Sequence, residues 1–213
     1  TDPIHKWIFE WVVGGYGKLP GERTNQSNLR FRVFSQERKA ENDLAEPVAR
    51  MLLKLWDFNA HKLRLDHSED FAKLVDVYLS WGGKAGGEQL FTEDVENGRP
   101  RKANAIYVYD LRSFQSPLER AREIAHEYGH ATLPPMGRYE KPEAWANGFL
   151  GERMYLQWML AEMKSGRLTP GDAMGVTPEL LSTYVKAKVT PLIDAAALNG
   201  PNPTLLKGTT EAA

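Results

Sequence analysis

The apolar residues of this chain follow two spacings, that of a β-strand in the first part and that of an α-helix in the second. The position at which the helical spacing takes over restricts the fold more than any other feature. Three segments alternate apolar and polar residues with the period of a half-buried β-strand: 29–35, 75–79 and 104–109. A weaker segment of this kind covers 88–95. One helical pattern, within 41–59, interrupts them, and from Ser116 onward the spacing is helical throughout. This order predicts an α+β fold with a mixed sheet first and helices after it.

The helices after the sheet are bounded by clear start and stop residues. Ser116-Pro117 predicts an N-cap and first helical residue, and Glu119 completes a capping box. That helix must end before Pro134. A second long helix is expected from Pro142 to Gly166. Its core-facing stripe is expected to consist of Leu150, Met154, Trp158 and Ala161.

The length of 213 residues suits one domain of two lobes. Residues 1–133 are expected to form an N-terminal lobe of sheet and helices that ends in the capped helix. Residues 134–200 are expected to form a helical lobe, and 201–213 a loosely ordered tail. This arrangement predicts a cleft between the sheet and the helices.

Composition excludes several classes of protein. Lys and Arg number 27 against 28 Asp and Glu, so there is no basic excess for nucleic acid, and no apolar run approaches the roughly 18 residues of a membrane span. Cysteine is absent, which rules out disulfides and thiolate sites. Because the chain also begins at Thr1 rather than Met, we expect an exported protein whose leader was removed, with a cytoplasmic location as the alternative. Nothing indicates an oligomeric state.

The capped helix carries the segment His126-Glu127-Tyr128-Gly129-His130. Residues four apart leave a helix from one face, so two imidazoles at this spacing can hold one Zn²⁺. The intervening Glu127 is placed to act as general base on a water activated by the metal. The pattern therefore predicts a zinc site of the kind found in metal-dependent peptidases.

A catalytic zinc site needs a third protein ligand. An extended histidine pattern is excluded because Leu133 and Met136 occupy its glycine and histidine positions. Glu143 is the preferred ligand because it precedes an expected core-facing stripe, where a carboxylate would need a cation. Asn147, one turn later, would accept the N–H of a ligating histidine. Glu152 is the rival ligand and is otherwise expected to be a solvated surface charge.

The two patterns together, His126-Glu127-x-x-His130 and Glu143-x-x-x-Asn147, resemble the gluzincin metallopeptidases. The segment "EAWANGF", 143–149, is similar to the third-ligand helix of their compact members, including relatives of the ImmA and IrrE regulators. The resemblance implies a zincin-like fold, with both histidines and Glu143 as zinc ligands and Glu127 as catalytic base. It also implies a peptide or protein substrate, lying against a sheet edge formed by Ala105 to Tyr109.

Three functions remain open at this stage. The first is a zinc peptidase, in which a tyrosine would stabilise the oxyanion; the candidates are Tyr184, Tyr155 and Tyr139. The second is a zincin-like regulatory or binding module that keeps the metal without general proteolysis, and the lack of a recognisable oxyanion residue motivates it. The third is a metal-free α+β domain with structural histidines.

Overall fold

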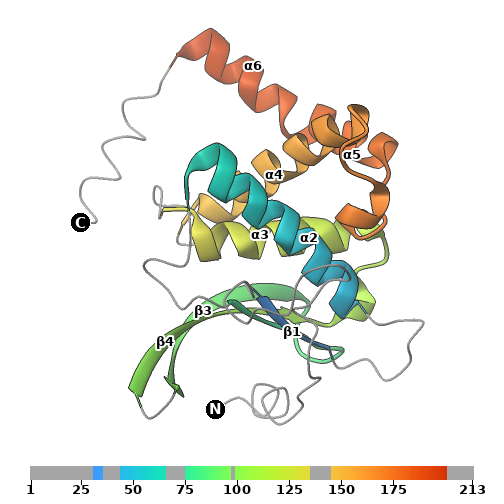
Figure 1. Ribbon diagram of the computed structural model, residues 1–213. Coiled ribbons are helices and arrows are strands. Elements are labelled where there is room, and N and C mark those ends of the chain that lie inside the picture. Colours follow the sequence, from blue (N-terminus) through green and yellow to red (C-terminus); the bar gives the residue numbers. More distant parts are fainter. Residues whose placement is uncertain (1–30, 36–43, 66–74, 97–98, 135–144, 201–213) are drawn as a thin grey trace.

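The fold is mixed α+β, as the two hydrophobic periods predict (Figure 1). The computed structural model describes residues 31–35, 44–65, 75–96, 99–134 and 145–200. The strands are β1 (Phe31–Ser35), β2 (Val75–Leu79), β3 (Gly86–Glu96) and β4 (Arg99–Tyr109). The α-helices are α2 (Ala45–Phe58), α3 (Pro117–Thr132), α4 (Asn147–Lys164), α5 (Pro178–Lys188) and α6 (Thr190–Asn199). Shorter helical turns are η3 (Asn59–Leu63), η4 (Leu111–Ser113) and η5 (Pro170–Ala173).

The four strands form one sheet in the order β1-β2-β4-β3. β1, β2 and β4 run parallel, and β3 pairs antiparallel with β4. Val75, Val77 and Leu79 alternate onto the face that carries the main core, as their period predicts. The expected sheet edge at 105–109 is wrong, because β4 lies inside the sheet. The edge strand beside it is β3, whose many charged and glycine residues gave the weaker strand signal.

The helices α2 and α3 pack on one face of the sheet, and α4 packs on α3 (Figure 1). The predicted start of α3 is confirmed: Ser116 caps the helix and exchanges hydrogen bonds with Glu119 in a capping box. The helix ends at Thr132, before Pro134. Asn104 of β4 donates a hydrogen bond of 2.8 Å to the carbonyl of Ala131, which fixes the last turn of α3 against the sheet.

Glycines bring α3 and α4 into close contact. A methyl group on Gly129 would lie 2.6 Å from the carbonyl oxygen of Asn147 and 3.1 Å from the Cα of Gly151. A methyl group on Gly151 would in turn lie 2.6 Å from the Cα of Gly129. No side chain fits at either position, so the backbones touch. This contact explains why Gly129 stands in a helix between two histidines. It also brings the start of α4 close to the face of α3 that carries His126 and His130.

Two expectations for α4 are corrected. The helix begins at Asn147 rather than Pro142, and its first residue, Asn147, is bonded to His130 and to the carbonyl of Leu133 at the end of α3. The expected stripe is correct in part: Met154 and Trp158 are half-buried and pack against the core, whereas Leu150 and Ala161 are exposed. The contacting glycines turn a different face inward, and its buried members are Asn147, Gly148, Gly151, Glu152, Tyr155, Leu156, Met159, Leu160 and Met163.

In the part of the chain that the structure describes, no helix combines the length and apolar character needed to cross a membrane. The expected tail, 201–213, lies outside the described residues. The two-lobe division of the chain stays a prediction.

Candidate metal centre

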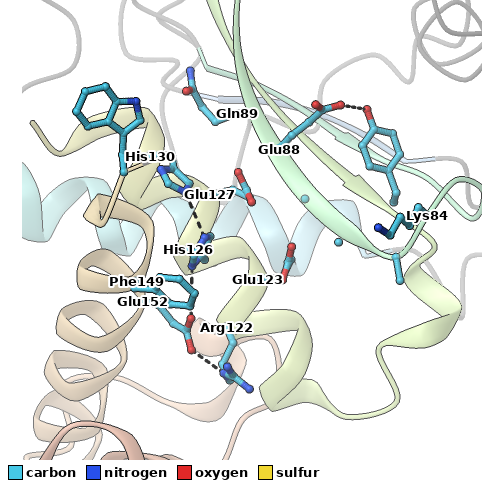
Figure 2. Close-up of a pocket in the computed structure, with 15 residues that line it drawn as sticks. Lys84, Glu88, Gln89, Arg122, Glu123, His126, Glu127, His130, Phe149 and Glu152 are labelled. Atoms are coloured by element: carbon cyan, nitrogen blue, oxygen red, sulfur yellow. Dashed lines mark hydrogen bonds and ion pairs between the residues drawn. The ribbon is translucent and has the colours of Figure 1, made fainter. Parts of the chain in front are cut away.

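His126 and His130 project from consecutive turns of α3 with their Nε2 atoms 3.2 Å apart (Figure 2). The two rings meet edge to face at a centroid distance of 4.8 Å. Two nitrogens bound tetrahedrally to one zinc ion, each at about 2.0–2.1 Å, lie about 3.3–3.4 Å apart. The observed separation therefore suits one shared ion.

The other ring nitrogen of His130 faces an acceptor. Asn147 donates from its Nδ2 to the carbonyl of Leu133 at 3.1 Å, which fixes the orientation of the amide. Its Oδ1 then lies 2.8 Å from the Nδ1 of His130 and can only accept. His130 thus carries its proton on Nδ1 and leaves a lone pair on Nε2. The sequence predicted a contact of Asn147 with one of the histidines, and the structure brings the two residues together.

The other ring nitrogen of His126 faces Glu152, whose Oε2 is 3.5 Å from Nδ1. The expectation that Glu152 is a solvated charge is wrong, because the residue is only 4% exposed. Its Oε1 accepts from the Nε of Arg122 at 2.6 Å and from the hydroxyl of Tyr184 at 2.8 Å. The carboxylate reaches the nitrogen of His126 that points away from His130, so it orients the ring rather than adding a ligand between the two Nε2 atoms.

The charge of Glu152 depends on these partners. Burial by itself raises the pKa of this carboxyl, but hydrogen bonds from His126, Arg122 and Tyr184 bring its pKa below the usual value. Burial, together with the negative charge of Glu152, raises the pKa of the Tyr184 hydroxyl, which therefore stays protonated and donates. An ionised Glu152 accepts from the Nδ1 of His126, so the neutral form of this histidine has its lone pair on Nε2.

The space between the two Nε2 atoms is bordered by Gly148 of α4. A methyl group on Gly148 would lie 2.3 Å from the Nε2 of His130 and 2.6 Å from that of His126. Two lone pairs that face each other across 3.2 Å, beside a residue without a side chain, fit a shared cation. Within the described ranges, His, Asp and Glu do not form a metal-binding group of three. The predicted third ligand, Glu143, lies outside those ranges.

Glu127 lines the same pocket, which has a volume of about 720 Å³ between α3, the start of β3 and the start of α4. The residue is buried at 4% exposure. It lies under Gly87 of β3, where a methyl group would come within 2.8 Å of its carboxylate oxygen Oε1. Lys84 to Gly87 form the rim of this pocket.

The tyrosines proposed for the oxyanion do not line this pocket where the structure describes them. Tyr184 is bonded to Glu152. Tyr155 accepts a hydrogen bond of 2.9 Å from Asn59 on the far side of α3, and burial raises its pKa to about 12. Tyr139 lies outside the described residues.

Several lining residues were not predicted from the sequence: Arg122, Glu123 and Phe149. Phe149 packs edge to face on His126 with the ring centroids 4.7 Å apart. Glu123 stands one helical turn before Glu127, and this spacing was the available signal for it.

Comparison of the chain with known proteins found no matching protein family, no similar curated protein and no similar solved structure.

Proposed function

We propose that this protein is a zinc-dependent peptidase of gluzincin type. The observation that carries the proposal is the facing pair of Nε2 atoms, 3.2 Å apart, with the Nδ1 of each ring directed at an oxygen atom. This arrangement fixes both imidazoles in the tautomer that binds metal. His126, His130 and Glu143 would hold the ion.

A bound zinc ion would lower the pKa of its water and polarise the substrate carbonyl. The residues of the chain supply the rest of the chemistry. Glu127 would accept a proton from the attacking water and pass it to the leaving amine. Asn147 and Glu152 would hold the two imidazoles in place during the reaction. Burial of Glu127 in the pocket excludes bulk water around the carboxylate.

A peptide substrate would lie along β3, the edge strand of the described sheet, rather than along 105–109. The first residues of β3 border the pocket, and Gly87 lies over Glu127 without a side chain between them. An extended backbone on this edge would run past the catalytic carboxylate.

One observation favours a second candidate, a zincin-like binding module with the metal but without general proteolysis. Tyr184 and Tyr155 are bonded to other groups rather than directed into the pocket, so neither is placed to stabilise an oxyanion. In this module the pocket would recognise a peptide segment and release it uncut.

Mass spectrometry distinguishes the peptidase from the binding module. The protein is incubated with a diverse mixture of peptides, and the products are analysed. The peptidase predicts new termini, which disappear on metal chelation and return when zinc is restored. Cleavage that persists after complete removal of metal would contradict the proposal. Zinc binding with no cleavage of any peptide would favour the binding module.

A further inference from the structure

The two histidines of the candidate metal centre are oriented in different ways. Asn147 accepts from the Nδ1 of His130 and is itself fixed by the backbone carbonyl of Leu133 at the end of α3. Glu152 of α4 faces the Nδ1 of His126 and is held by side chains of α3 and α5. The orientation of His126 therefore depends on how three helices pack together.

The carboxylate of Glu152 is fixed at one oxygen and directed at His126 with the other. Its Oε1 accepts from the Nε of Arg122 at 2.6 Å and from the hydroxyl of Tyr184 at 2.8 Å. The last torsion of a glutamate side chain is broad, so the plane of the carboxylate depends on its partners. Two donors from different helices fix this plane and leave Oε2 directed at the Nδ1 of His126, 3.5 Å away. Figure 2 shows Arg122, Glu152 and His126 joined in this order.

Tyr184 contacts both members of this ion pair from α5. Its hydroxyl donates to Glu152, and the guanidinium of Arg122 lies over its ring at 5.4 Å from the centroid. Tyr184 is 5% exposed and Glu152 is 4% exposed, so water cannot readily replace the hydrogen bond between them. A residue of α5 thus determines where the partner of His126 lies.

We propose that Tyr184 and Arg122 are positioning residues that raise the zinc affinity of the site through Glu152. This inference rests on the metal site of the proposed function. Loss of either donor would allow the carboxylate to turn away from His126. The imidazole would then lack a fixed acceptor on Nδ1 and would have to be oriented when the metal binds, which lowers the affinity.

Zinc titration of Tyr184→Phe tests this role, because the substitution removes the hydroxyl and keeps the ring beneath Arg122. The affinity is expected to fall by roughly 3- to 10-fold, since one hydrogen bond is lost and its effect on the ligand is indirect. Arg122→Met removes the charged donor and is expected to lower the affinity further. Tyr155→Phe is the matched control: it removes another buried tyrosine hydroxyl, whose partner is Asn59, and should leave zinc affinity unchanged.

The same substitution in a Glu152→Gln background shows whether Tyr184 acts through Glu152. Residues that act through one another have non-additive effects. In that background Tyr184→Phe is expected to change zinc affinity by no more than about 2-fold, the scatter of independent sites. Equal losses in the two backgrounds would overturn the inference. A loss in Tyr155→Phe as large as in Tyr184→Phe would overturn it too, because general destabilisation would then account for both.

Zinc binding is measured without substrate, so failure of the inference and failure of the peptidase are distinguishable. A wild-type protein that binds zinc and cleaves no peptide would contradict the peptidase, and the affinities of the variants would still decide about Tyr184. Wild-type affinity in Tyr184→Phe and Arg122→Met would overturn the inference alone. A wild-type protein that binds no zinc would overturn both. Circular dichroism checks the fold of each variant, and Arg122→Met replaces Tyr184→Phe in the comparison if the latter is unfolded.

Discussion

Glu127→Gln is expected to abolish peptide hydrolysis while the protein keeps its metal. The amide has nearly the same shape as the carboxylate but accepts no proton, and loss of a general base typically lowers the rate by roughly 100- to 10,000-fold. The residue contributes no ligand to the pair of Nε2 atoms, so zinc content should not change. Steady-state kinetics and elemental analysis of the same sample measure both effects.

Glu179→Gln is a suitable control for this experiment. It makes the same chemical change on the exposed first turn of α5, away from the pocket. Its activity should equal that of wild type. A Glu127→Gln variant that cleaves peptides at the wild-type rate would remove Glu127 from the mechanism.

Gly148→Ala is expected to eliminate zinc binding without unfolding the chain. The new methyl group would lie 2.3 Å and 2.6 Å from the two Nε2 atoms, so the imidazoles must move apart. Such a displacement should lower zinc affinity by more than the roughly 10- to 100-fold typical of changes to the partners of a ligand. Overpacking costs about 1–3 kcal/mol, while alanine in a helix recovers about 1 kcal/mol relative to glycine, so the fold should persist.

The control for this prediction is Gly171→Ala, where a methyl group would meet only the hydroxyl of Thr169 at 3.6 Å. Zinc titration and thermal unfolding are measured for both variants. Loss of zinc in Gly148→Ala with a folded circular dichroism spectrum is the expected result. Full zinc affinity in that variant would show that the ion does not lie between the two imidazoles.

Local signals in the sequence predicted the part of the fold that local interactions determine. The period-two segments became β1, β2 and β4, and the weaker segment became β3. The capping box of Ser116 and Glu119 located the start of α3 because both partners lie within one turn. The spacing of His126 and His130 likewise required only a helix to bring their rings together.

Contacts between distant segments were not predictable in the same way. Glu152 has Arg153 beside it, which favoured a solvated charge, although Tyr155 and Leu156 at helical spacing were a signal of burial. The contacts with Arg122 and Tyr184, which come from two other helices, could not be predicted from this local pattern. The sheet edge was placed at 105–109 because the resemblance to gluzincins implied it, but strand order depends on pairing between distant segments, and β4 pairs on both sides. The inward face of α4 carries large apolar residues at helical spacing, Tyr155, Leu156, Met159 and Met163, and the glycine contact with α3 turns this face toward the core.

Three properties stay predictions: the zincin-like fold, the zinc ligands and the exported location. Among them, the zinc site is the most important, because the proposed roles of Glu127 and β3 depend on a metal between the two histidines. The ion would be held by His126, His130 and Glu143.

The most direct test is the zinc content of the purified protein beside Glu143→Ala and Glu152→Gln. About one zinc per chain is expected in wild type and none in Glu143→Ala, because a catalytic zinc site needs three protein ligands. Glu152→Gln should retain the ion with roughly 10- to 100-fold lower affinity, because it alters only the partner of His126. Wild-type protein that holds no zinc after incubation with the metal and removal of the excess would contradict the account.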